Sequence, residues 1–341
     1  MKFTTAKFIG SLFITLLVGL LMLAGVYRHF GLGGQRLESD PTALAAQAKE
    51  ALDAVRNRRP GERRPASYDA VLQPLDRLLQ LSRELIHSVD YDPMADFDKL
   101  FATAMPAFTI AGEANAQAQT ETGPLAKDFR FNAQRAEAAQ YLAAALWSRT
   151  TANHASAEGF GGGDEPYPPA EIEWTLSTIN AGLEADPENR SLWYLRGAVN
   201  RAAGLFAAAA RDLERSLELD PGNPEAENAL GLVYIDLKQL DKAEEHIEKA
   251  RAAALQIASA NGTAPGADYT TIIFNLARFH EGLAAFYARE NRLAPSAENA
   301  RLTQKHSDEA RKHLGEFLSR EPAGSPDAAL ARRLLDGLPS Q

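Results

Sequence analysis

The chain has 341 residues, of which 45% are hydrophobic and 24% are charged, and this balance excludes collagen-like and wholly disordered proteins. It contains no cysteine, which excludes thiol nucleophiles, thiolate zinc sites, disulfide frameworks and lipid attachment through cysteine. Its 36 Lys and Arg against 45 Asp and Glu give a net charge of −9, so nucleic acid is not an expected partner.

The first predicted element is a membrane-spanning helix at residues 8–26. This segment, FIGSLFITLLVGLLMLAGV, carries no charge over 19 residues, and as a helix it would cover about 28 Å of hydrocarbon. A cleaved signal peptide, the main alternative, usually has an apolar core of only about 7–15 residues. It also needs a small residue three positions before the cut. For cuts after Ala24 and Gly25, that position holds Met22 and Leu23. The sequence therefore predicts a retained signal anchor within residues 1–34.

The residues around this span indicate its orientation only weakly. Lys2 and Lys7 precede it, and Arg28 and Arg36 follow it, so the count of basic residues hardly discriminates. The short basic start before an apolar run is similar to an export signal, which favours an internal N-terminus. With the Ala- and Arg-rich, cysteine-free composition, this predicts a single-pass protein of the bacterial inner membrane whose body lies in the periplasm.

Residues 35–110 form a predicted juxtamembrane helical region. Asp40-Pro41 is a helix start, because Asp caps free amides and Pro suits the first helical position. Residues 67–88 carry apolar side chains at spacings of three and four, which predicts a second helix. A third helix begins at Asp92-Pro93, and the acids around it are interpreted as caps, because the loop lacks the Gly and Glu of a calcium loop.

Residues 111–130 are small and polar without an apolar period, which predicts a linker or a loose helix. A helix follows from Asn132 to about Thr150. The Gly- and Pro-rich segment 153–169 is then predicted to be a loop.

A repeat of 34 residues is the most informative feature of the chain. LEADPEN at 183–189 returns as LELDPGN at 217–223, with five identities in seven positions. The same step carries Gly197 to Gly231 and Ala209 to Ala243. A period of 34 with small residues where helices cross and Pro after the second helix is typical of stacked helix pairs.

These residues resemble the tetratricopeptide repeat family in two units, 190–223 and 224–257. The first unit has the aromatic, small, turn, bulky and breaker residues where the family has them: Trp193, Gly197, Gly204, Ala209, Leu213, Leu217 and Pro221. The second unit keeps most of them but has Lys238 at the turn glycine and Leu255 at the breaker, so its second helix is expected to run on.

The flanks complete the predicted array over residues 131–341, because one helix pair cannot bury its apolar stripe alone. Residues 132–150 and 172–183 look like a degenerate unit split by the loop. Residues 269–291 and 306–320 look like another pair, with an insert at 292–302. Residues 326–338 are predicted to cap the last open face. The expected fold is thus all-α: a transmembrane helix, further helical segments and a right-handed α-solenoid of tetratricopeptide-like pairs.

The resemblance implies that the first helices of the units line a concave groove that holds a protein or peptide. It places five contact residues there: Tyr194, Arg201, Asn228, Leu232 and Ile235. The family's clamp for chaperone C-termini needs Lys and Asn where Tyr194 and Ala198 stand, so that specificity is not supported. These side chains could instead merely pack between helices, and Phe160 and Tyr167 of the loop form a competing site.

The sequence predicts neither a cofactor nor a metal site, and it does not predict an enzyme. The seven histidines include no pair four residues apart on a helix, and no Gly-x-Ser-x-Gly elbow exists. His306 and His313 share a helix face but stand about 10.5 Å apart along it. The favoured function is a membrane-anchored extracytoplasmic scaffold that binds a protein partner in envelope assembly, secretion or maturation. The alternative is an accessory binding subunit of a transport or cofactor-maturation system.

Overall fold

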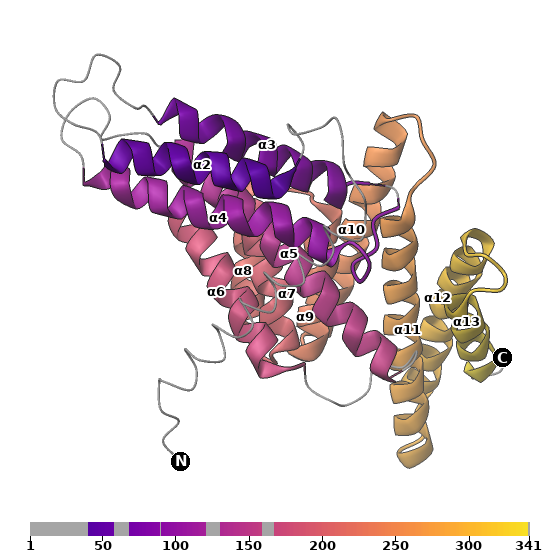
Figure 1. The fold of residues 1–341 in the computed structure, drawn as a ribbon. Helices are drawn as coiled ribbons and strands as arrows, with labels where there is room; N and C mark the ends of the chain where they lie inside the picture. The colour runs from indigo at the N-terminus through magenta and orange to yellow at the C-terminus, as the bar shows by residue number, and fades with distance from the viewer. Residues whose placement is uncertain (1–39, 58–67, 89, 121–129, 159–166, 340–341) are drawn as a thin grey trace.

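The computed structural model describes residues 40–57, 68–88, 90–120, 130–158 and 167–339, and within these ranges it has twelve helices and no strand. Each helix packs mainly against its neighbours in the chain, which is the arrangement of a helical solenoid (Figure 1). The all-helical, tetratricopeptide-like prediction is therefore confirmed for this part of the chain. The predicted span at 8–26 lies outside the described residues, and among the helices inside them none has the length and hydropathy to cross a membrane.

Three helices form a bundle before the repeats: α2 (Pro41–Arg56), α3 (Asp69–Ile86) and α4 (Phe97–Gln119). The predicted start of α2 is confirmed, because the Asp40 carboxylate accepts a hydrogen bond of 2.9 Å from the Thr42 amide. Before α4, Asp92 Oδ1 accepts hydrogen bonds from the backbone amides of Met94 and Ala95 at 2.7 and 3.0 Å. The predicted helix start at Asp92-Pro93 is wrong, because α4 begins at Phe97, and Asp92 caps the turn that precedes the helix.

The linker predicted at 111–130 begins later than expected, because α4 continues to Gln119. Ala111, Ala114 and Ala118 are buried on one face of its last turns. Their spacing of three and four is helical, but alanine adds little hydrophobicity, so the period is hard to see in the sequence. These alanines pack against neighbouring helices, although the sequence of the segment is mostly small and polar.

Helix α5 (Arg130–Glu158) joins the bundle to the array. Its Phe131 and Leu142 lie in the core of α2–α4, where the Phe131 ring meets the Tyr68 ring edge-on at 5.3 Å. Its Ala139 and Ala143 lie in the next core, with α6 (Pro169–Ala185) and α7 (Arg190–Ala202). The helix also runs to Glu158, so the first residues of the predicted loop are helical. One helix thus belongs to both cores, and packing is continuous across the predicted boundary at residue 131.

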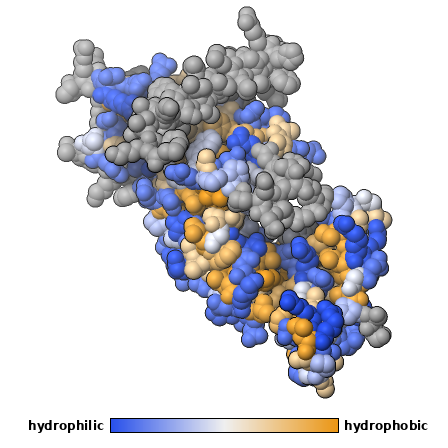
Figure 2. Space-filling view, turned by 90° about the horizontal axis from the view of Figure 1, so that it is seen from below, coloured by the Kyte–Doolittle hydropathy of each residue, from blue (hydrophilic) through white to orange (hydrophobic). Residues whose placement is uncertain are grey.

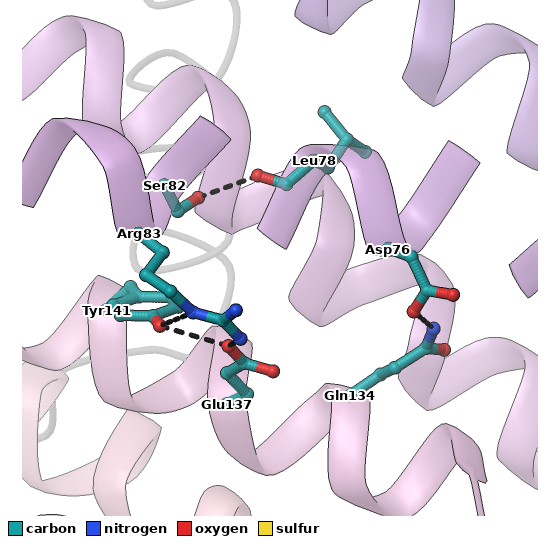
Figure 3. A network of polar contacts seen from close by, with 7 residues as sticks. All are labelled: Asp76, Leu78, Ser82, Arg83, Gln134, Glu137 and Tyr141. Carbon is teal, nitrogen blue, oxygen red and sulfur yellow. Dashed lines mark hydrogen bonds and ion pairs between the residues drawn. The ribbon is translucent and has the colours of Figure 1, made fainter. Parts of the chain in front are cut away.

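A polar network also ties α3 to α5 (Figure 3). Arg83 donates from Nε to the Tyr141 hydroxyl at 3.1 Å and forms an ion pair with Glu137. The Tyr141 hydroxyl in turn donates to Glu137 at 2.9 Å, and burial raises the pKa of Tyr141. A turn away, the Gln134 amide donates to Asp76. The bundle is therefore fixed on the first helix of the array by charged hydrogen bonds as well as by apolar contact.

The two clear units are the pairs α7 with α8 (Phe206–Leu219) and α9 (Pro224–Asp236) with α10 (Leu240–Ala260). Their caps repeat with the sequence period, since Asn189 accepts from the Leu192 amide at 3.1 Å and Asn223 from the Ala226 amide at 2.9 Å. Helix α10 runs past residue 255, as expected from the missing breaker. The degenerate unit is also confirmed, because α5 packs against α6.

The C-terminal end consists of α11 (Ala267–Leu293), α12 (Ala297–Arg320) and α13 (Pro326–Gly337). Helices α11 and α12 form the long pair on the right of Figure 1, and α13 lies against α12. The insert predicted at 292–302 is wrong, because α12 begins at Ala297, where the Ser296 hydroxyl caps it by accepting from the Asn299 amide at 3.0 Å. The first turns of α12 are polar and exposed, so the sequence showed no apolar period there. The predicted cap at 326–338 is confirmed, with Ala331 and Leu338 in the last core.

Candidate functional site

The first helices of successive units line a groove of about 530 Å³. It is bordered by α7, α9 and the start of α11, with α5 at one edge. Four of the predicted contact residues lie along it, Tyr194, Arg201, Asn228 and Leu232, together with Ala198, Glu225 and Asp236. The sequence period places these residues together because each unit repeats the orientation of the one before it.

Two polar contacts between helices hold the groove walls in place. Arg201 Nε on α7 donates to Asp236 Oδ2 on α9 at 2.6 Å, and both side chains are partly exposed. Asn275 on α11 donates from its side-chain amide to Asn228 Oδ1 on α9 at 3.1 Å. The polar groups of the groove are therefore oriented before any partner arrives, which lowers the entropy cost of binding.

Ile235 does not line the groove, in contrast to the prediction. Its half-buried side chain packs against the core formed by α8–α11. Successive residues of a helix are about 100° apart, so Leu232 and Asp236 lie together on the groove face while Ile235 is turned to its margin. Four of the five predicted contact residues thus border the groove and one supports its wall.

An aromatic pair that the repeat pattern does not contain closes one edge of the groove. The Trp147 ring of α5 lies 5.3 Å from the Tyr167 ring, which precedes α6, and both residues line the groove. Tyr167 belongs to the Gly- and Pro-rich segment, so the competing site and the groove meet at this residue. Phe160, the other residue of that competing site, lies outside the described residues. Thr271 and Ile272 of α11 add a further wall. Nothing in the sequence singled out Trp147, because its contact depends on how the degenerate unit is placed.

A partly buried ion pair fixes α7 against α8. Arg196 donates from Nη2 and Nε to the two carboxylate oxygens of Asp212 at 2.7 and 3.0 Å. The Asn200 amide donates to the same carboxylate at 2.7 Å, and the guanidinium lies 4.3 Å from the Trp193 ring centre. Asp212 is only 6% exposed, so these donors replace most of the water that an exposed carboxylate would contact.

A histidine of α11 meets two histidines of α12 on the other side of α11. His280 of α11 lies beside His306 and His313 of α12, and all three are buried. The ring planes of His280 and His306 are 25° apart, and those of His280 and His313 are 9° apart. Among the described residues no cluster of His, Asp or Glu has the geometry to hold a metal ion.

The surface seen from below the array is mixed in character. Apolar side chains gather in several patches that polar side chains separate (Figure 2). Among the exposed large apolar residues, Phe286 and Leu293 lie at the end of α11. The groove is thus distinguished by its fixed polar groups rather than by hydrophobicity alone.

Comparison with known proteins supports the repeat assignment. A model of the tetratricopeptide repeat family matches residues 200–261, from the end of α7 through α10. The resemblance drawn from the 34-residue period is therefore confirmed for this part of the chain. No curated protein matches the chain.

Several solved structures are similar to this chain at low sequence identity. The crystal structure of MamA is 15% identical over 66% of this chain and 94% of its own, with a TM-score of 0.36. TTC0263, a thermophilic TPR protein of Thermus thermophilus, is 20% identical over 61% of this chain and 91% of its own, with a TM-score of 0.30. The Cut9–Hcn1 hetero-tetramer of APC/C is 15% identical over 91% of this chain and 57% of its own, with a TM-score of 0.36. At such scores these likenesses carry no argument about function.

Proposed function

We propose that the chain is a membrane-anchored scaffold that holds a protein partner in the groove between α7, α9 and α11. The observation that carries this proposal is the groove itself, in which residues 34 or more positions apart converge with their polar groups already oriented. Tyr194 and Arg201 are the proposed anchors, because aromatic and Arg side chains dominate binding energy at protein interfaces.

The anchor and the compartment of this proposal rest on the N-terminal sequence. The uncharged segment 8–26 has the length of a membrane span, and its basic start favours a translocated body. A scaffold in that position would act in envelope-complex assembly, secretion or maturation. In this proposal the scaffold binds its partner, and any reaction is carried out by the partner.

The test of binding is recovery of partners from membranes by crosslinking and affinity purification of the full chain. Replacement of both Tyr194 and Arg201 by Ala should remove the partner, since loss of an interface anchor often costs at least about 2 kcal/mol. The matched control is Phe286→Ala with Arg289→Ala, an exposed aromatic and Arg pair on α11. Circular dichroism of each variant checks that the fold is kept.

Two outcomes would contradict the groove as the binding surface. One is undiminished recovery with the groove variant while the control variant loses the partner. The other is loss of the partner only when residues 159–168 are deleted, which would assign binding to the Gly- and Pro-rich segment.

The topology is tested separately with fusions at Gln341. Alkaline phosphatase should be active there and a fluorescent protein that folds only in the cytoplasm should be dark. The opposite pattern would contradict the periplasmic placement, and a mature chain that starts near Val26 would contradict the anchor.

A further inference from the structure

The buried histidines lie where α10, α11 and α12 meet. His280, His306 and His313 are 2%, 4% and 0% exposed, so they have almost no access to bulk water. The His280 ring lies 5.2 Å from that of His306 and 5.9 Å from that of His313, and the Tyr287 ring lies 5.7 Å from that of His306. This is a compact cluster of three histidine rings inside a helix interface.

The contact between His280 and His306 admits one proton but not two. Their Nδ1 atoms are 3.0 Å apart and their ring centres 5.2 Å apart, so the two nitrogens lie between the rings and face each other at hydrogen-bond distance. One Nδ1 must carry the hydrogen and the other must offer its lone pair. If both rings were protonated, two N–H donors and two positive charges would face each other, so the contact would break.

His313 lacks the partners that a charged ring needs. Neither of its ring nitrogens has a hydrogen-bond partner in the structure, and the closest carboxylate oxygen, Glu309 Oε2, is 3.6 Å from Nε2. Burial lowers the pKa of His313 and of His306, and burial together with the neighbouring histidines lowers the pKa of His280 to about 4.

The surrounding charges do not offset this burial. Acids and bases face the cluster from both α10 and α12 in similar number: Glu244, Glu248, Arg251, Lys305, Glu309 and Lys312. Glu309 is already engaged, because Lys312 donates to it at 2.8 Å. The Tyr287 ring is the further titratable neighbour from α11. Proton uptake must therefore be matched by opening of the interface to water.

We propose that the His280, His306 and His313 cluster makes the packing of α11 against α12 and α10 sensitive to acid, so that acidification loosens α11. Helix α11 carries Thr271 and Ile272 on the groove wall and the Asn275 amide that holds Asn228. Loosening of α11 would thus widen the groove. That consequence rests on the proposed function, whereas the acid-sensitive packing does not.

The sign of the effect follows from linkage. A histidine whose pKa is lower in the folded chain contributes its full stability above its unfolded pKa of about 6.5. As the pH falls below that value, the unfolded or open form takes up the proton first. For His280, the ratio of closed to open forms should fall by up to about tenfold per pH unit between about pH 6.5 and about pH 4.

The test uses the full chain and its lack of cysteine, because any introduced thiol is then the only one. Ala284→Cys places a reporter at a fully buried position of α11, and Ala143→Cys places a control at a fully buried position of α5. Dithiodipyridine labels thiols at acid pH, and each rate is divided by that of the same chain unfolded at the same pH. From about pH 7.5 to about pH 5, labelling at Ala284→Cys should rise at least tenfold, and labelling at Ala143→Cys should change far less.

Histidine substitutions test whether the pH dependence of labelling comes from the cluster. On the Ala284→Cys background, His280→Gln and His313→Gln should each flatten the pH response, whereas His87→Gln, at an exposed position, should leave it unchanged. If one variant fails to fold, the other still decides. The proposal would be overturned by labelling at Ala284→Cys that is independent of pH, by an equal rise at Ala143→Cys, or by an unchanged response in the folded histidine variants. None of these readouts depends on a partner, so their failure is distinct from failure of the proposed function.

Discussion

The glycines at the helix crossings are required by the closeness of two helices. A Cβ atom at Gly197 would lie 2.6 Å from Leu213 Cγ, and one at Gly231 would lie 2.5 Å from Ile247 Cγ1. These contacts repeat with the 34-residue period. The repeat predicted a close helix crossing at these glycines, because small residues recur there, but it did not predict Leu213 and Ile247 as the neighbours.

Replacement of Gly231 by Ala should therefore destabilise the chain. The added methyl would also stand 3.1 Å from the backbone oxygen of Ala243, which cannot move aside easily. Overpacking of this kind costs about 1–3 kcal/mol, measured as a lower free energy of unfolding in urea. In the control, Gly315→Ala, the methyl meets open space, and the gain in helix preference should be about 0.5–1 kcal/mol. Equal stabilisation by both substitutions would contradict the assigned crossing.

Replacement of Lys238 by Gly should stabilise the chain. Gly204 ends α7 with φ of 73°, and Lys238 ends α9 with φ of 61°, where non-glycine residues are disfavoured. The same hydrogen bond closes both turns, since the Leu205 and Gln239 amides donate to the Asn200 and Tyr234 carbonyls at 2.8 and 2.9 Å. Relief of strain, less the greater freedom of Gly in the unfolded chain, should give about 0.5–1 kcal/mol. Thermal unfolding measures it, and a lower melting temperature than wild type would show that Lys238 is not strained.

Helices were predictable where bulky apolar residues recur along one face. They were not predictable where that face consists of alanine or polar residues. The pattern at residues 67–88 predicted α3 and the repeat predicted α7–α10, whereas the end of α4 and the start of α12 lack that signal. The pairing of Arg196 with Asp212 was also hidden, because each residue alone looks like an exposed charge on a helix. Only the packing of α7 on α8 shows that Asp212 is buried.

At the level of helix pairs, Arg196→Ala should be among the most damaging charge removals. It leaves the buried Asp212 carboxylate without its bidentate partner, and removal of one member of such a pair typically costs about 3 kcal/mol. The control is Arg215→Ala, which breaks the exposed ion pair with Glu218 and should cost less than about 0.5 kcal/mol. Denaturant unfolding of the two variants should differ widely, and similar losses would mean that the partly buried pair adds little.

For the whole molecule, the structure shows that the α2–α4 bundle and the repeats have separate cores, which α5 joins because its residues pack into both. The sequence could not predict this, because it gives the apolar face of each helix but not which distant face covers it. The same limit explains why the histidines of α11 and α12, 26 or more residues apart, were not predicted to meet. The groove residues on α7 and α9 could be predicted, since the repeat fixes the orientation of these two helices.

A fragment that begins at residue 130 should be less stable than one that begins at residue 40. Without α2–α4, Phe131, Leu142 and Leu146 on α5 would be exposed to water, and full exposure of such side chains costs about 1.5–3 kcal/mol each. The shorter fragment should unfold at lower denaturant and self-associate in analytical ultracentrifugation. Equal midpoints for both fragments would show that the bundle and the array are independent.

The central claim is that the groove between α7, α9 and α11 holds a protein partner. The most direct measurement is photocrosslinking in cells from a single photoreactive residue placed at Leu232, on the groove face, or at Glu218, exposed on α8. We predict a discrete crosslinked partner from position 232 and none from position 218. Crosslinks from position 218 and none from position 232 would contradict the account.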